Sequence, residues 1–183
     1  VNPAPTLSST LTPAAICSGD LFIYTATSIT AGATFNWSRA AVAGISNPAS
    51  SGTGDVSEIL VNATTSPVNV TYVYTLAANG CSSTQNVVVT VNPTPKLTSS
   101  LTAPVQCSGA LFSYTPASST AGTLFSWSRA VVVGISNPLG AGVGNPNEIL
   151  INTTAMPVVV TYVYTLSANG CTNASTYSVN VTV

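Results

Sequence analysis

The feature that most constrains this chain is an internal repeat with a period of 90 residues. Aligned without a gap, residues 1–93 match residues 91–183 at 52 positions, including Trp37/Trp127 and Arg39/Arg129. Repeats dictate the architecture of a chain, and this unit is too long for one turn of a solenoid. It suits a small all-β domain. We therefore expect two domains of one kind, residues 1–92 and residues 93–183.

A proline-containing joint separates the two copies. The segment Val91-Asn92-Pro93-Thr94-Pro95 matches the first five residues, Val1-Asn2-Pro3-Ala4-Pro5. Two prolines in such a short segment predict a stiff connection rather than a flexible tether. Since the chain begins with this joint and stops where the next joint is due, we expect it to be two links of a longer tandem array.

Comparison of the copies separates inward from outward positions. Ile23 becomes Ser113, whereas Phe22 and Tyr24 are retained as Phe112 and Tyr114, so segment 21–24 is predicted to be a strand with its aromatic residues inward. The same two-residue period predicts strands at 35–38, 71–76 and 87–91, with a further strand at 58–61. Asn79-Gly80 predicts a hairpin turn between two of them.

No stretch of the sequence has helical periodicity, so the predicted fold class is all-β. We expect two tandem immunoglobulin-like β-sandwich domains of about seven strands each. The aromatic residues expected in the two cores are Phe22, Tyr24, Phe35, Trp37, Tyr72, Tyr74, Phe112, Tyr114, Phe125, Trp127, Tyr162 and Tyr164.

The near absence of charge excludes several function classes. The chain has three Lys and Arg residues, four Asp and Glu residues and no histidine. General acid–base catalysis usually needs histidine or paired carboxylates, and calcium sites need several acidic ligands. Nucleic-acid binding needs more cations than these. We therefore expect no enzyme activity, no cofactor or metal and no nucleic-acid partner.

Hydropathy and net charge suggest how the chain behaves in solution. No apolar run approaches the roughly 18 residues of a transmembrane helix, so we expect no membrane insertion. A net charge of −1 gives almost no repulsion between copies. Neutral polar side chains must then supply solubility, and we expect the chain to self-associate readily.

The four cysteines, Cys17, Cys81, Cys107 and Cys171, predict disulfides and an exported protein. Pairing within each repeat, Cys17 with Cys81 and Cys107 with Cys171, is the favoured prediction. In an immunoglobulin-type order, however, these partners lie at opposite ends of a strand, roughly 23 Å apart. Disulfides need Cα atoms within about 7 Å. The alternative joins Cys17 to Cys171 and leaves the other two for neighbouring domains or subunits.

Other polar and aromatic residues have both structural and functional interpretations. Arg39 with Glu58, and Arg129 with Glu148, are expected to form structural ion pairs between strands. Trp37 could stack on sugars, but its alternation pattern favours the core. Asn-x-Ser/Thr sequons begin at Asn36, Asn62, Asn69, Asn152, Asn173 and Asn180, about as many as chance predicts from the composition, so they do not establish glycosylation.

The order of several short motifs resembles a known family. Cys-Ser-Gly is followed by Phe-x-Tyr-Thr, Phe-x-Trp-Ser-Arg-Ala, Thr-Tyr-Val-Tyr-Thr-Leu, Asn-Gly-Cys and Val-x-Val-Asn-Pro. This order resembles the PKD-like, immunoglobulin-like tandem repeats of large Bacteroidota cell-surface adhesins, of the gliding-motility type carried by type IX secretion. The Trp-Asp-Phe-Gly-Asp signature of true PKD domains is replaced here by residues 37–40, Trp-Ser-Arg-Ala.

The resemblance implies an extracellular location at the cell surface and a structural function. We expect a repeat module of an adhesin or fibre, acting as a stalk or spacer and able to assemble into filaments. The alternative is a carbohydrate-binding accessory module of a secreted protein. The expected partners are neighbouring repeats of the same chain, further copies in a filament and surface glycans.

Overall fold

The computed structural model describes residues 2–183 and divides the chain into unit 1, Val1–Pro93, and unit 2, Thr94–Val183. The division falls after Pro93, one residue beyond the position that the repeat suggested. The regular structure of the described residues consists of strands, without a helix. The predicted all-β class is therefore confirmed.

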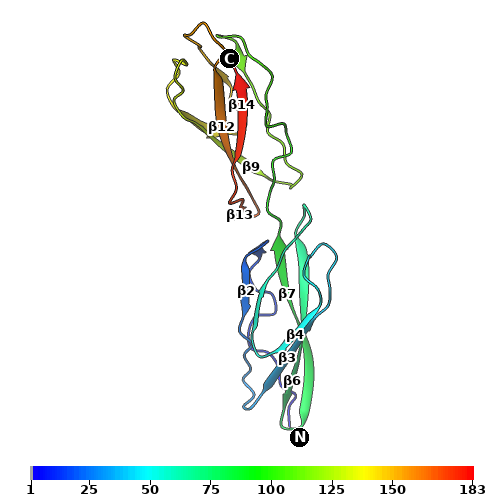
Figure 1. The fold of residues 1–183 in the computed structure, drawn as a ribbon. Helices are drawn as coiled ribbons and strands as arrows, with labels where there is room; N and C mark the ends of the chain where they lie inside the picture. Colours follow the sequence, from blue (N-terminus) through cyan, green and yellow to red (C-terminus); the bar gives the residue numbers. More distant parts are fainter. Residues whose placement is uncertain (1) are drawn as a thin grey trace. The chain divides into compact units, whose positions relative to one another are not determined.

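Unit 1 is a sandwich of a large and a small sheet (Figure 1). The large sheet has the order β1-β7-β6-β3-β4, and β2 pairs with β5 in the small one. The strands are β1 (Ile16–Cys17), β2 (Leu21–Tyr24), β3 (Thr34–Arg39), β4 (Ser50–Thr53), β5 (Val56–Ile59), β6 (Val68–Ala78) and β7 (Cys81–Asn92). The strand expected at 58–61 thus begins and ends two residues earlier than predicted.

Unit 2 repeats this arrangement. One sheet has the order β10-β9-β12, with β13 and β14 both pairing to β12, and β8 pairs with β11 in the smaller sheet. The strands are β8 (Leu111–Phe112), β9 (Leu124–Arg129), β10 (Gly140–Val143), β11 (Glu148–Ile149), β12 (Val159–Ala168), β13 (Cys171–Thr172) and β14 (Tyr177–Thr182).

Each unit has a hydrophobic core of its own between its two sheets. Alternate residues of β6 point inward, so Tyr72, Tyr74 and Leu76 are fully buried. Of the predicted core aromatic residues, Phe35 and Phe125 are only partly buried and pack against the edges of the two clusters. They lie near the first residues of β3 and β9, at one end of each strand, rather than at its centre.

The hairpin between β6 and β7 has the predicted turn. Asn79 and Gly80 have positive φ angles of 50° and 77°, as a two-residue type I′ turn requires. Asn169 and Gly170 form the same turn in unit 2, with φ angles of 52° and 79°. Asparagine and glycine tolerate this left-handed conformation better than other residues, which explains why this dipeptide stands at both turns.

The last strand of unit 2 differs from that of unit 1 by a shift in register. Tyr72 pairs with Val87 in unit 1, but Tyr162 pairs with Val179 rather than with Tyr177, the counterpart of Val87. Residues 173–176 form a break between β13 and β14, in which Asn173 Oδ1 accepts a hydrogen bond from the amide of Ser175 at 2.9 Å. The shift of two residues leaves every side chain on its original face, because the side-chain period of a strand is also two.

Candidate functional site

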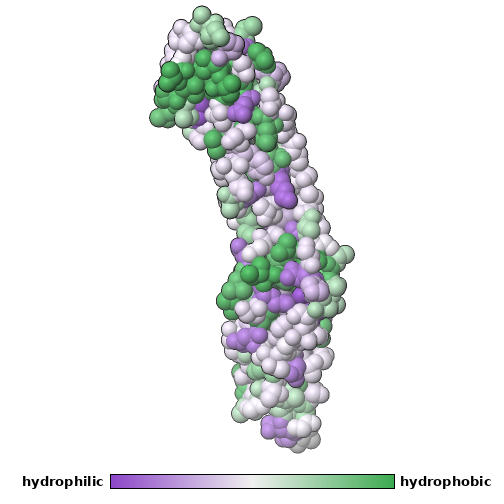
Figure 2. Space-filling view, viewed as in Figure 1, coloured by the Kyte–Doolittle hydropathy of each residue, from purple (hydrophilic) through white to green (hydrophobic). Residues whose placement is uncertain are grey.

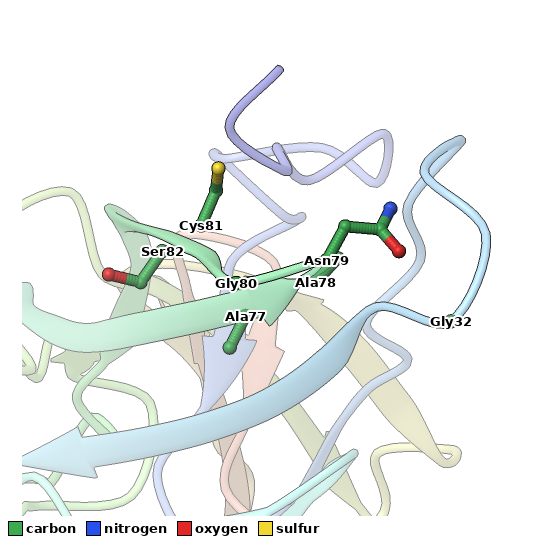
Figure 3. Close-up of a pocket in the computed structure, with 7 residues that line it drawn as sticks. All are labelled: Gly32, Ala77, Ala78, Asn79, Gly80, Cys81 and Ser82. Carbon is green, nitrogen blue, oxygen red and sulfur yellow. The ribbon is translucent and has the colours of Figure 1, made fainter. Parts of the chain in front are cut away.

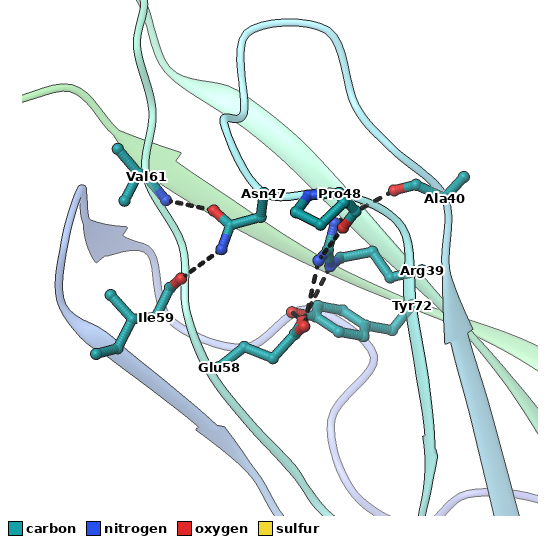
Figure 4. A network of polar contacts seen from close by, with 8 residues as sticks. All are labelled: Arg39, Ala40, Asn47, Pro48, Glu58, Ile59, Val61 and Tyr72. Atoms are coloured by element: carbon teal, nitrogen blue, oxygen red, sulfur yellow. Dashed lines mark hydrogen bonds and ion pairs between the residues drawn. The ribbon is translucent and has the colours of Figure 1, made fainter.

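A buried ion-pair cluster stands where the small sheet of unit 1 faces β3 and β6 (Figure 4). Arg39 donates from Nε to Glu58 Oε2 at 2.9 Å and from a terminal nitrogen to Glu58 Oε1 at 3.2 Å. The Tyr72 hydroxyl donates to Glu58 Oε2 at 2.6 Å. Arg39 also donates to the carbonyl oxygens of Pro48 at 2.8 Å and Ala40 at 3.3 Å. The cluster therefore joins both sheets and a loop.

Unit 2 contains the same cluster with nearly the same dimensions. Arg129 donates to both carboxylate oxygens of Glu148 at 3.0 Å, and the Tyr162 hydroxyl donates to Oε2 at 2.6 Å. The carbonyl oxygen of Pro138 accepts a further bond from Arg129 at 2.7 Å. Arg39 and Arg129 are each only 2 % exposed. Since protein groups surround these cations, the arrangement has the form of an internal crosslink rather than a ligand contact.

The surroundings of the carboxylates shift their pKa values downward. Burial opposes ionisation of Glu58, but hydrogen bonds from Arg39, Tyr72 and Ser50 outweigh this effect and hold its pKa below the usual 4.5. For Glu148 the hydrogen bond from Arg129 is the largest effect and also lowers the pKa. Burial is the main reason why the pKa of the Tyr72 hydroxyl is raised, so this group stays a hydrogen-bond donor.

These shifts predict that acid destabilises the protein. A carboxyl group whose pKa is lower in the folded state stabilises that state above its unfolded pKa, and this contribution disappears as the pH falls through the folded pKa. We expect the melting temperature to decrease once the pH is lowered below about 4.5, which is the ordinary pKa of a glutamate side chain such as Glu58. Calorimetry across the acid range measures this. Asp20→Asn, which removes an exposed carboxyl, should leave the acid transition unchanged, and a constant melting temperature down to about pH 3 would contradict the prediction.

The two tryptophans lie inside the sandwiches, at 8 % exposure for Trp37 and 9 % for Trp127. The Trp37 ring meets Tyr72 edge-on, with a centroid distance of 5.6 Å. Gly52 on β4 lies against the same indole, so closely that an added Cβ would stand 2.7 Å from the ring. Because protein atoms cover the ring, Trp37 does not offer a sugar a surface on which to stack.

Two asparagines in each repeat have structural roles that the sequence analysis did not identify. Asn47 donates to the carbonyl oxygen of Ile59 at 2.8 Å and accepts from the amide of Val61 at 2.9 Å (Figure 4). Asn62, 6 % exposed, donates to the carbonyl oxygens of Ser66 and Val91, both at 2.8 Å. Asn137 and Asn152 do the same in unit 2.

The asparagine contacts decide one question about glycosylation. The Asn62 side-chain nitrogen, to which a glycan would be attached, is already engaged and buried in the folded unit. The sequon at Asn62 is therefore a structural motif, and the half-buried Asn152 makes the equivalent hydrogen bonds in unit 2. The identity of both asparagines in the two copies was the one signal in the sequence that pointed to their roles.

The cysteines correct the favoured disulfide prediction. Cys17 and Cys171 are disulfide-bonded, whereas Cys81 and Cys107 are free thiols. Pairing within each repeat is therefore wrong, because each of those bonds needs one of the two free thiols. The alternative pairing uses Cys17 and Cys171 and leaves the other two free.

The strand arrangement of unit 1 explains why the favoured bond does not form. Cys17 pairs in register with Asn92, the last residue of β7, while Cys81 is the first residue of the same strand. At about 3.3 Å per residue the two positions stand roughly 36 Å apart. A disulfide tolerates about 7 Å between Cα atoms, so these two cysteines cannot meet in the folded unit.

The outer face of each small sheet is apolar. Leu21 pairs with Ile59 across β2 and β5, and Ile23 lies beside them; all three side chains are more than half exposed. Figure 2 shows hydrophobic residues on the surface at this part of unit 1. Leu111 and Ile149 form the corresponding exposed pair in unit 2. These residues give unit 1 an apolar strip of three side chains and unit 2 a smaller one of two, because Ser113 stands in place of Ile23.

Among residues 2–183, no three histidine, cysteine, aspartate or glutamate residues gather as a metal-binding group. The same range has no helix of the length and apolarity that crossing a membrane requires.

The chain has similarities to known proteins at low sequence identity. No curated protein matches the chain. Three solved structures are similar at low identity. The I-band fragment I67-I69 from titin is 11 % identical with a TM-score of 0.48; the match covers 99 % of this chain and 66 % of the fragment. A chimeric titin Z1Z2-Z1Z2 tandem is 12 % identical, with 97 % of each chain covered and a TM-score of 0.31.

The third structure is a protein of unknown function from Porphyromonas gingivalis W83, 11 % identical, with 98 % of this chain and 99 % of that chain covered and a TM-score of 0.31. The sequence itself also has a similarity, since residues 14–95 match the family described as PKD-like domain. Such domains are generally structural rather than catalytic, and together with a disulfide they are typical of extracellular proteins. Unit 1 has an immunoglobulin-like β-sandwich fold, its residues 14–95 are similar to the family described as PKD-like domain, and unit 2 is a second copy of the same repeat.

Proposed function

We propose that this chain is a structural repeat module of an extracellular adhesin or fibre at the cell surface, in which tandem units form a stalk or spacer. The partners that this function implies are neighbouring repeats of the same chain and further copies of it. The observation that carries the proposal is where the polypeptide enters and leaves a single unit.

In unit 1 the chain begins and leaves at opposite ends of its longest strands. Asn2 donates to the carbonyl oxygen of Asn79, in the β6–β7 turn, at 3.2 Å. The chain leaves after Asn92, at the other end of β7. We call these the N-terminal end and the C-terminal end of the unit. A strand of this length spans roughly 36 Å, so each added unit can lengthen a tandem array by about that distance.

The polar composition supports a passive role. Both ion pairs, Arg39–Glu58 and Arg129–Glu148, are enclosed within their own units. That leaves Asp20, Asp55 and Lys96 as the other charged residues of the chain. A surface with so few charges repels neighbouring copies weakly, which favours lateral packing of fibres. The apolar strips of the two small sheets add to the same tendency.

Electron microscopy of the native-length protein, released from cells without reduction, tests the proposal. We expect slender fibres, or filaments made from them, with a repeat of roughly 35–40 Å along the axis. Antibody labelling of intact cells should detect the units at the surface. Compact particles without an axial repeat, or labelling that needs permeabilised cells, would contradict the proposal.

The carbohydrate-binding alternative loses its main structural argument. Its candidate platform, Trp37 and Trp127, belongs to the two cores, where Gly52 and Gly142 lie against the indole rings. Surface glycans as partners of the array would therefore have to be recognised by polar side chains.

A further inference from the structure

The large sheet of unit 2 has an open edge at β10. This strand is the last one of its sheet and pairs with β9 on one side. No other strand among residues 2–183 pairs with its outer side. At β14 the sheet is covered instead, because segment 101–106 forms hydrogen bonds with Asn180 and Thr182. An open strand edge is a template for pairing with another chain unless its sequence prevents this.

The backbone groups of β10 that point to the open edge follow from one hydrogen bond. Gly144 donates its amide hydrogen to the carbonyl oxygen of Phe125, in β9, at 2.8 Å. The trans peptide before Gly144 therefore directs the carbonyl group of Val143 away from β9. Because this direction alternates along a strand, Ala141 also presents its N–H and C=O groups to the open edge. A further strand can bond to these groups.

Comparison of the two repeats shows that the edge of unit 2 has lost polar protection. β4, the equivalent strand of unit 1, has exposed hydroxyl side chains at Ser51 and Thr53. The counterparts in β10 are Ala141 and Val143, which are also exposed. The acidic residue that follows β4, Asp55, is a neutral asparagine in unit 2. Since polar and charged residues keep sheet edges apart, the edge of unit 2 favours pairing more than that of unit 1.

Exposed apolar side chains surround the same edge. Val143, Leu139 directly before β10 and Leu124 on β9 are each more than two-thirds exposed. Leu124 and Val143 also line a surface hollow of about 420 Å³ together with Phe125. The counterparts of the three exposed residues in unit 1 are one alanine and two threonines. A strand added at β10 would remove this apolar surface from water while it bonds to the free backbone groups.

The edge is complementary to itself. When two copies of β10 run antiparallel about a two-fold axis at Ala141, this residue faces its own copy and Val143 faces Leu139 of the second copy. Ala141 and Val143 then stand at hydrogen-bonded positions of the ladder. On the opposite face Gly140 meets Gly142 of the second copy, and neither has a side chain that could collide. Segment 139–143 contains no charged residue, so the register brings no like charges together.

We propose that the β10 edge of unit 2 is a pairing site for a second copy of this chain, which joins the large sheets of two molecules into one antiparallel sheet. The occupant is a second copy because the edge matches itself in backbone direction, side-chain size and lack of charge. Such a contact uses the same surface on both molecules and closes after two copies. The inference goes beyond the proposed function, since tandem units in one chain form a stalk without it.

The test uses the whole chain without its two free thiols. Cys81 lines a shallow depression beside the β6–β7 turn (Figure 3), and Cys107 is exposed, so both are replaced by serine to exclude intermolecular disulfides. Sedimentation equilibrium should then show a concentration-dependent dimer of the 18.4 kDa chain. The amide protons of Ala141 and Val143 should exchange more slowly as the concentration rises, because the new ladder protects them.

Charge variants at the two-fold axis identify the partner. Ala141→Lys places two lysines face to face, so we expect the dimer dissociation constant to rise about fivefold or more. Ala141→Asp should have the same effect. A mixture of these two variants should recover the dimer, with one chain of each kind, because opposite charges then meet. Ser51→Lys, at the equivalent exposed position of unit 1, is the matched control and should change the dissociation constant by less than about twofold.

Four outcomes would overturn the proposal. The thiol-free chain could stay monomeric at its highest soluble concentration, or Ala141→Lys could dimerise as tightly as its parent. The mixture of the lysine and aspartate variants could fail to pair. Finally, Ser51→Lys could weaken the dimer as much as Ala141→Lys does. None of these results bears on the electron-microscopy test of the stalk, because the axial repeat comes from units within one chain.

Discussion

We expect the Arg39→Met variant to lose about 3–5 kcal/mol of the free energy of unfolding of unit 1. Methionine fills much of the space of the arginine stem but cannot donate hydrogen bonds. Glu58, with its side chain only 15 % exposed, would keep a negative charge without its bidentate partner. The carbonyl oxygen of Pro48 would lose its donor as well. The loss is large because a buried charge is left uncompensated, which costs more than the intact pair contributes.

Hydrogen exchange during urea titration measures this effect separately in the two units. Lys96→Met is the matched control, because it removes the same charge from an exposed side chain and should change the stability by less than about 0.5 kcal/mol. The double variant Arg39→Met, Glu58→Leu should recover part of the loss, since neither charge then remains buried alone. Equal stability of Arg39→Met and Lys96→Met would show that the cluster is not a structural crosslink.

The second large effect is expected for Phe22→Ala, at about 3–5 kcal/mol. Phe22 is 2 % exposed in β2 and lies against Tyr72, with a ring-centroid distance of 5.5 Å. Its removal leaves a cavity between the two sheets that the rigid strands cannot close. The next residue, Ile23, is 64 % exposed, so Ile23→Ala should change the stability by less than about 0.5 kcal/mol.

Phe22→Ala and Ile23→Ala form a matched pair, because each removes an apolar side chain from the same four-residue strand, β2. Denaturant unfolding followed by tryptophan fluorescence in a Trp127→Phe background reports on unit 1, because Trp37 is then the remaining indole and lies in the core of that unit. A similar loss of stability for both variants would mean that β2 does not alternate between core and solvent as described.

The strands and the two cores could be predicted from the sequence because the repeat supplies an internal comparison. Positions that change freely between the copies, such as Ile23 and Ser113, face solvent, and the unchanged aromatic residues beside them face the core. The hairpin was predictable for a separate reason, since few residue pairs other than Asn-Gly accept two positive φ angles in succession.

Other features are not marked by any pattern in the sequence. The shift in register of β14 follows from the turn at Asn173, and its two-residue size leaves the hydrophobic pattern unchanged. The roles of Asn47 and Asn62 depend on backbone atoms that no pattern in the sequence identifies. The position of Cys81 relative to Cys17 depends on the length of β7, which is 12 residues rather than the five that alternation alone indicated.

The direction of the first segment of each unit has a mechanical consequence. Along β7, the N-terminal segment makes parallel contacts in order: Leu11 with Val88, Ile16 with Val91 and Ser18 with Asn92. A force that pulls the ends of unit 1 apart would draw these parallel segments past one another, so it would load their hydrogen bonds in shear. Bonds loaded in shear share the force and must break together, whereas bonds at the mouth of a hairpin open one at a time.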